Sequence, residues 1–131
     1  MNQVDLSFDR VVIPADYARL ANQTDWANDR GAPEIRQALQ SCHVVLGAWD
    51  DARLVGMARV ISDGVYVAQI IDLVVDESYR SHGLGSRMMT LLLDRCAEIE
   101  VVMLTCGPDQ EAFYRRFGFV GGLRMSRRSR P

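Results

Sequence analysis

An apolar strand, a glycine-containing turn and a helix are predicted to follow one another between residues 67 and 93. Residues 67–75 are mostly apolar and rich in β-branched side chains, which is typical of a buried strand. After a short polar turn, apolar residues return at the three- and four-residue spacing of an amphipathic helix: Leu84, Met88, Leu91 and Leu92. The other elements of the chain have to pack around this strand–turn–helix unit.

The turn before the helix has the features of a phosphate-binding site. The first N–H groups of a helix have no acceptor within it and lie at the positive end of its dipole. Gly83 and Gly85 carry no Cβ, so a ligand can approach the main chain closely. Arg80, just before the turn, can add a charge-assisted hydrogen bond. The alternative is a tight strand-to-helix turn that binds nothing.

Two familiar phosphate-binding loops are excluded by the sequence. A dinucleotide-binding loop needs a third glycine, but this position holds Met88. A mononucleotide-binding loop needs a lysine, and the chain contains none. The pattern that remains is Arg-x-x-Gly-x-Gly after an apolar strand, formed by Arg80, Gly83 and Gly85.

The remaining elements predict a mixed α/β sheet with helices on both faces. Sequence patterns indicate strands over residues 4–13, 43–49, 54–61 and 101–105, helices over 15–23 and 34–40, a helix ending at 117, and a short strand through Leu123 and Met125. Antiparallel hairpins come first and a β-α-β crossover follows. We expect one domain over residues 1–131, with a frayed tail over 124–131.

Composition restricts the partners and the compartment. The formal net charge of −2 gives no indication of nucleic-acid binding. The three cysteines, Cys42, Cys96 and Cys106, are widely spaced, so neither a zinc site nor a disulfide framework is expected. The first residues lack the pattern of a signal peptide, and no apolar run reaches membrane-spanning length. We therefore expect a cytoplasmic protein that binds neither metal nor membrane.

A second motif lies downstream of the glycine turn. Residues 113–119 read Phe-Tyr-Arg-Arg-Phe-Gly-Phe and are predicted to close a helix. Together with Arg80, Gly83 and Gly85 after an apolar strand, this segment resembles the GCN5-related N-acetyltransferase (GNAT) superfamily, over residues 40–119. Residues 54–59, 62–64 and 72–75 are most similar to its small bacterial and serotonin N-acetyltransferase-like branch.

The resemblance implies a GNAT fold and acetyl-CoA as the cofactor. It implies an N-acetyltransferase that transfers an acetyl group to a primary amine of a small molecule by direct attack. Tyr114 takes the position of the family's general acid, which protonates the leaving thiolate. The cofactor would bind along the main chain of one strand and on the glycine turn, through Leu73, Val74, Val75, Arg80, Ser81, His82, Gly83, Leu84, Gly85 and Ser86.

The base and the acceptor pocket are less constrained. Asp72 is a carboxylate within an apolar strand and is our candidate base, acting through water. The alternatives for Asp72 are a structural acceptor for N–H groups and an ion pair with Arg59. Weaker candidates for the base are Gln69, Asp63 and Glu77. Trp26 and Tyr66 are candidates to line an acceptor pocket, or else to plug the core.

Two departures from the family pattern leave other functions open. Gly107 replaces an asparagine that many members carry, which removes one contact to pantetheine or water. The chain ends soon after Phe119, so either a partner chain completes the last strand in a homodimer or the pocket is open on that side. The rival functions are acetylation of a protein lysine or N-terminus, and a catalytically silent CoA-binding regulatory module.

Overall fold

Five strands form one sheet, and their order in space follows the chain. The computed structural model describes residues 3–130. The strands are β1 (Asp5–Ser7), β2 (Val44–Asp50), β3 (Arg53–Ser62), β4 (Val67–Val75) and β5 (Val101–Met103). Neighbours from β1 to β4 are antiparallel, whereas β5 is parallel to β4. The predicted mixed α/β class and the crossover after β4 are confirmed.

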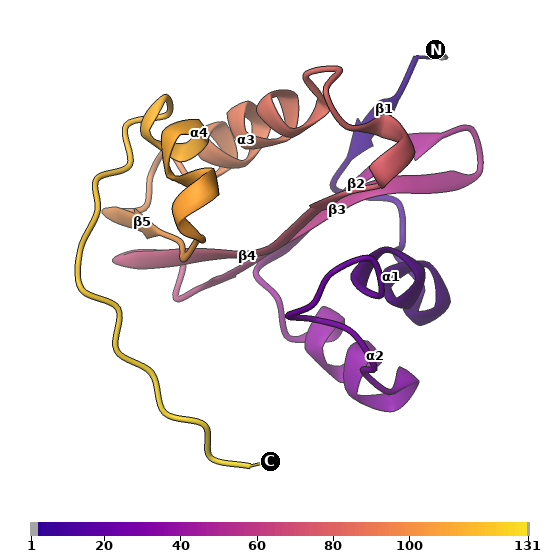
Figure 1. Ribbon diagram of the computed structural model, residues 1–131, viewed down its shortest axis with the longest axis horizontal. Helices are drawn as coiled ribbons and strands as arrows, with labels where there is room; N and C mark the ends of the chain where they lie inside the picture. The colour runs from indigo at the N-terminus through magenta and orange to yellow at the C-terminus, as the bar shows by residue number, and fades with distance from the viewer. Residues whose placement is uncertain (1–2, 131) are drawn as a thin grey trace.

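Helices cover both faces of the sheet (Figure 1). On one face lie α1 (Pro14–Ala21) and α2 (Ala32–Gln40), and on the other lie α3 (Leu84–Arg95) and α4 (Glu111–Arg115). Two short 3-10 helices, η1 (Glu77–Tyr79) and η2 (Pro108–Gln110), precede α3 and α4. Among the described residues, no helix has the length and apolar character needed to cross a bilayer.

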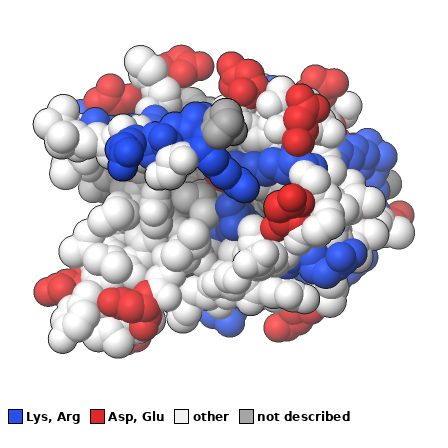
Figure 2. Space-filling view, turned by 90° about the horizontal axis from the view of Figure 1, so that it is seen from below, with Lys and Arg blue, Asp and Glu red and all other residues white. Residues whose placement is uncertain are grey.

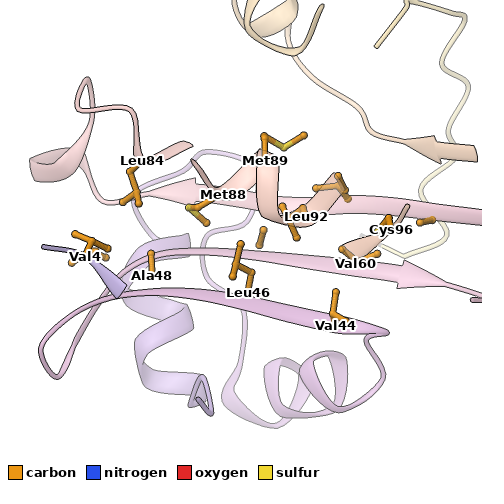
Figure 3. Packing of buried hydrophobic residues seen from close by; sticks show 14 residues of the cluster. Val4, Val44, Leu46, Ala48, Val60, Leu84, Met88, Met89, Leu92 and Cys96 are labelled. Carbon is orange, nitrogen blue, oxygen red and sulfur yellow. The ribbon is translucent and has the colours of Figure 1, made fainter. Parts of the chain in front are cut away.

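The two faces of the sheet carry separate apolar cores. On one face, α3 packs on β2, β3 and β4, and Figure 3 shows Met88 and Leu92 above Leu46. On the other face, Tyr17 and Leu20 of α1 belong to a second buried cluster that includes residues of β3 and β4. Burying one such side chain contributes about 1.5–3 kcal/mol. The central strand β4 is therefore held from both sides.

The N-terminal strand is shorter than predicted. Instead of continuing to residue 13, β1 ends at Ser7. The reason is that Ser7 Oγ accepts hydrogen bonds from the N–H groups of Asp9 and Arg10, both at 3.0 Å, which turns the chain out of the sheet. Pro14 then begins α1, at a position where a helix tolerates its missing N–H.

The predicted strand through Leu123 and Met125 is wrong. Residues 119–130 form no helix or strand, and these two side chains are 90% and 85% exposed. A strand needs a hydrogen-bonded neighbour, and no described strand pairs with this segment. The turn that follows α4 ends at Gly118, which has a φ of 89°, and the chain beyond it runs in an extended path (Figure 1).

Candidate active site

A pocket of about 580 Å³ opens beside the C-terminal end of β4. Its walls are residues 23–26 of the α1–α2 loop, residues 73–75 of β4, the turn before α3, and the segment from η2 to α4. The structure thus brings the end of β4 together with Arg80, Gly85 and Tyr114, which the sequence analysis singled out. A volume of this size accommodates a substantial part of a small ligand.

The strands β4 and β5 diverge at this pocket. Their pairing ends at Gln69 and Met103, whereas β4 continues to Val75. On its other edge, the end of β4 pairs with β3. Main-chain groups of residues 73–75 are therefore left without a strand partner on the β5 side, where they can bind an extended ligand.

A β-bulge lies at the start of this segment and includes Asp72 and Leu73. Met57 of β3 opposes Val74, but Arg59 opposes Ile71, so β4 has one more residue than β3 between the two pairs. Asp72 lies within the bulge and has a φ of 55°, in the left-handed region that a non-glycine residue seldom adopts. A bulge bends its strand locally, so this one helps to set the direction of the main chain at residues 73–75.

The glycine turn presents unpaired N–H groups, as expected. Gly83 is the N-cap of α3 and has a φ of 80°, which glycine adopts without steric cost. The first bond of the helix runs from the Arg87 N–H to the Gly83 carbonyl oxygen (3.1 Å), so the N–H groups of residues 84–86 have no acceptor within the helix. Arg80 Nε donates to the carbonyl oxygen of Val75 (3.0 Å), which ties this guanidinium to the end of β4.

Gly85, the second residue of α3, leaves space that a side chain would fill. A Cβ built on it would lie 3.6 Å from Phe113 Cζ, an ordinary contact, so the fold alone does not require glycine. Gly85 lines the pocket. The space is therefore available to a ligand that lies on the start of α3, and the N–H groups and open strand edge fit the phosphates and pantetheine arm of acetyl-CoA.

Tyr114 stands on α4 at the wall of the pocket. Its ring makes edge-to-face contacts with Phe113, at a centroid distance of 5.0 Å, and with Phe119, at 6.2 Å. Burial, with a smaller contribution from Cys106, raises the pKa of Tyr114 above its ordinary value. The phenol therefore stays protonated at neutral pH and can donate a proton.

The carboxylate of Asp72 is buried in a cluster of its own. Its Oδ2 accepts hydrogen bonds from Tyr17 Oη (2.6 Å), Arg59 Nε (2.7 Å) and Arg30 Nη1 (3.2 Å), and Arg30 also donates to the Tyr17 hydroxyl. The residue is 8% exposed and does not line the pocket. The ion pair with Arg59, one of the alternatives from the sequence, is thus present.

A second buried carboxylate, Asp76, follows β4 directly and was missed by sequence reasoning. Its Oδ1 accepts from the Ser78 N–H (2.9 Å), and its Oδ2 lies 3.4–3.5 Å from donors of Arg19, Arg53 and Gln23. Burial opposes ionisation, but these hydrogen bonds and charges prevail and lower the pKa of Asp76. The signal in the sequence was an aspartate two residues before a serine at the end of a strand, which is typical of a capped turn.

The remaining candidates divide between pocket and surface. Trp26 lines the pocket and is 53% exposed. Tyr66 lies in the β3–β4 turn, away from the pocket, and Asp63 caps that turn by accepting from three N–H groups at 2.8–3.2 Å. Gln69 and Glu77 are also outside the pocket. Within residues 3–130, no group of three or more His, Cys, Asp and Glu side chains could hold a metal ion.

Sequence reasoning also missed part of the pocket wall. The acidic residues Asp25 and Asp109 line it, as do Gln23 and Gln110. Seen from below, the surface is hollowed, and arginine side chains gather beside the hollow (Figure 2). No sequence motif marks the four wall residues named above, two aspartates and two glutamines, because they lie in loops and short turns that only the fold brings together.

Comparison with known proteins identifies the family. The model of the acetyltransferase (GNAT) family matches residues 13–119. The chain is 32% identical over 108 residues to the uncharacterized N-acetyltransferase ycf52 of Porphyra purpurea, covering 78% of this chain and 62% of that protein. It is 35% identical over 117 residues to the histone acetyltransferase TAP1 of Glycine max, covering 79% of this chain and 50% of that protein. The chain thus spans less than two thirds of the length of either relative.

A solved structure shows the same arrangement along nearly the whole chain. The GNAT-family structure from Xanthomonas campestris pv. campestris superposes with a TM-score of 0.85 at 27% identity, covering 98% of this chain and 94% of that one. The residues matched by the family model include the bulged strand, the glycine turn and the helix with Tyr114. The chain therefore belongs to the acetyltransferase (GNAT) family.

Proposed function

We propose that this protein is an acetyl-CoA-dependent N-acetyltransferase that acts on a primary amine of a small molecule by direct attack in a ternary complex. The observation that carries the proposal is that one pocket combines an open strand edge, the N–H groups at the start of α3 and the protonated phenol of Tyr114. Each of these groups has a use in acyl transfer from a thioester to an amine.

The cofactor would bind along β4 and on the glycine turn. The N–H groups of residues 81–86 would hold its diphosphate, with Arg80 at the edge of the turn, because unpaired N–H groups at a helix start favour anions. The main chain of residues 73–75 would bind the pantetheine arm and polarise the thioester carbonyl. When bound, acetyl-CoA supplies the acyl group that the amine attacks.

Proton movements involve two parts of the pocket. Tyr114 would protonate the departing thiolate of CoA, since burial keeps its hydroxyl protonated. The amine has to lose a proton, and Asp25 and Asp109 are the carboxylates of the pocket wall that can attract a cationic amine and accept that proton. The role of Asp72 as a base that acts through water stays a prediction.

The acceptor that fits these walls is a cationic amine with an apolar or aromatic body. Trp26 offers an exposed ring for the body, and the two wall carboxylates offer attraction for the ammonium group. Acetylation of a protein lysine or N-terminus is the second candidate, favoured by the similarity to the histone acetyltransferase TAP1. We also propose that the chain belongs to the small bacterial and serotonin N-acetyltransferase-like branch, on the basis of residues 54–59, 62–64 and 72–75.

An assay of thiol release tests the function. Acetyl-CoA would be mixed with the protein and a panel of arylalkylamines, polyamines and lysine peptides. We expect release of CoA that depends on at least one small amine. Release only with peptides would favour the second candidate. Binding of acetyl-CoA in calorimetry without turnover on any amine would favour a silent regulatory module instead.

We further propose that a second copy of the chain covers the outer edge of β5. Val101 and Met103 are exposed on that edge, and Leu123 and Met125 alternate with polar residues in the extended tail. The acidic residues Glu98 and Glu100 precede β5, whereas the tail carries four arginines: Arg124, Arg127, Arg128 and Arg130. Apolar alternation and opposite charge make the tail of a second copy a suitable added strand.

A further inference from the structure

Asp72 occupies a position that the backbone does not favour. Its φ of 55° lies in the left-handed region, within the bulge of β4. Aspartate tolerates this region better than most residues, but a strand with regular pairing offers no reason to adopt it. Contacts of the side chain therefore have to maintain the bulge.

Those contacts come from three separate elements. Arg59 belongs to β3, Tyr17 to α1 and Arg30 to the α1–α2 loop, and all three donate to the same oxygen, Asp72 Oδ2. Arg59, Tyr17 and Arg30 are the titratable and charged groups that the structure places against this carboxylate. Cys42 adjoins them, since its sulfur lies 3.7 Å from Arg59 Nη1. Asp72 and Arg59 are 8% and 9% exposed, so water competes little for these bonds.

Two buried carboxylates bracket the residues of β4 that line the pocket. Asp72 precedes residues 73–75 and Asp76 follows them. Each carboxylate also holds one end of the α1–α2 loop, through Arg30 at Asp72 and through Gln23 at Asp76. Gln23 Oε1 accepts in addition from the Glu77 N–H (3.0 Å). Trp26 and Asp25 of the pocket wall lie between these two anchors.

We propose that Asp72 is a positioning residue: its buried carboxylate fixes the β4 bulge, which directs the main chain of residues 73–75 toward the cofactor, and through Arg30 it fixes the loop that contacts the acceptor. This role rests on the proposed function. It makes one side chain responsible for the placement of both substrates, without contact to either. It differs from the role of a base, which would place the Asp72 carboxylate in a proton path.

Asp72→Asn separates the two roles, because it keeps the shape and removes the charge. For positioning, we expect the dissociation constant of acetyl-CoA, measured by calorimetry, and the KM of the amine each to rise about tenfold or more, since small displacements at a site are costly. The pH profile of kcat/KM should keep its acidic limb. If Asp72 is instead the base, Asp72→Asn should abolish the acidic limb of the kcat/KM pH profile and lower kcat about 10²–10⁴-fold, while the affinity for acetyl-CoA stays unchanged. That result would overturn the proposal.

Arg30→Gln is the second variant, and it remains informative if Asp72→Asn does not fold. This substitution removes only the contacts between the α1–α2 loop and the Asp72 cluster. We therefore expect the KM of the amine to rise while the dissociation constant of acetyl-CoA stays at the wild-type value. An unchanged KM in Arg30→Gln would contradict the loop part of the proposal. Asp63→Asn is the matched control, because this carboxylate also accepts several hydrogen bonds but lies away from the pocket.

The outcomes also distinguish this inference from the function on which it rests. If the wild-type protein bound no acetyl-CoA, the proposed function would be lost and the inference with it. If the wild-type protein bound and used acetyl-CoA, but Asp72→Asn kept both the wild-type affinity and the wild-type KM, only the positioning role would be overturned.

Discussion

Arg59 Nε lies 2.7 Å from Asp72 Oδ2, and this ion pair joins the two central strands β3 and β4 inside the protein. The two side chains are 11% and 6% exposed. Removing one member of a buried pair leaves the other charge without compensation, which is costly in a medium of low polarity. The pair therefore matters to stability as well as to the geometry of the pocket.

The first prediction concerns that pair. Asp72→Ala should lower the free energy of unfolding by about 3–5 kcal/mol, because Arg59 is left buried without its counter-ion. Urea denaturation with a constant m-value would measure the change. Asp94→Ala, at an exposed position on α3, is the control and should match the wild type. A loss for Asp72→Ala no larger than for this control would show that the pair does not stabilise the fold.

The second prediction concerns Tyr17 at alkaline pH. Burial, followed by the hydrogen bond to Asp72, raises the pKa of Tyr17 to about 12, against about 10 for an exposed tyrosine. Below pH 10 the hydroxyl is protonated in both states, so its contribution to stability is fully present. Between about pH 10 and 12 it ionises in the unfolded chain first, and the free energy of unfolding falls.

Tyr17→Phe tests this linkage. The variant should be less stable than the wild type at neutral pH by about 1.5–3 kcal/mol, the usual contribution of a hydrogen bond to a charged group. The difference should narrow as the pH rises from 10 to 12 in a series of urea denaturation curves. A difference that stays constant over this range would show that Tyr17 ionises alike in the folded and unfolded chain.

Whether a part of the fold or of the site can be predicted from the sequence depends on how far apart its residues lie along the chain. The strand, glycine turn and long helix around Gly83 and Gly85 are predictable, because their signals are local: apolar runs, helical spacing and a positive-φ residue at a helix start. Tyr114 is predictable because a short motif places it on a helix after the crossover. Both predictions depend only on residues that lie close to one another in the sequence.

The cluster at Asp72 is not predictable in the same way. Its members are separated by 13, 42 and 55 residues along the chain, and no single stretch contains the pattern. The sequence marks Asp72 only as a charge in an apolar strand, which is compatible with a base and with an ion pair alike. The strand predicted through Leu123 and Met125 is wrong for the opposite reason: these residues alternate locally as in a strand, but the tail pairs with no described strand.

The third prediction concerns Tyr114. Tyr114→Phe should lower kcat by about 10²-fold or more, because the phenyl ring fills the same space but cannot protonate the thiolate. The dissociation constant of acetyl-CoA should stay at the wild-type value. Tyr66→Phe is the matched control, since this tyrosine is 64% exposed and lies outside the pocket. Equal turnover of Tyr114→Phe and the wild type would remove Tyr114 from the mechanism.

The fourth prediction separates stability from binding at Gly85. Alanine is favoured over glycine within a helix by up to about 1 kcal/mol, and the added Cβ makes only an ordinary contact with Phe113. Gly85→Ala should therefore be at least as stable as the wild type in thermal unfolding. Its affinity for acetyl-CoA should nevertheless fall, because the new methyl group takes the space beside the N–H groups at the start of α3.

Two further glycines serve as controls for that experiment. Gly83→Ala should lose both stability and affinity, since a φ of 80° strains any residue with a Cβ. Gly122→Ala lies in the tail and meets no atom within 4 Å, so it should leave acetyl-CoA affinity unchanged. Undiminished affinity in Gly85→Ala would mean that the cofactor does not lie against the start of α3.

The fifth prediction concerns the edge of β5. If the tail of a second copy pairs with this edge, light scattering at micromolar concentration should give about twice the chain mass of 14.7 kDa. Leu123→Asp combined with Met125→Asp should return the mass to that of one chain, because two charges cannot lie on an apolar strand edge without loss of hydration. Val11→Asp changes an exposed apolar residue before α1 and should leave the dimer intact. A wild-type mass of 14.7 kDa at every concentration would rule out the dimer while leaving the pocket and its chemistry untouched, since neither tail residue lines it.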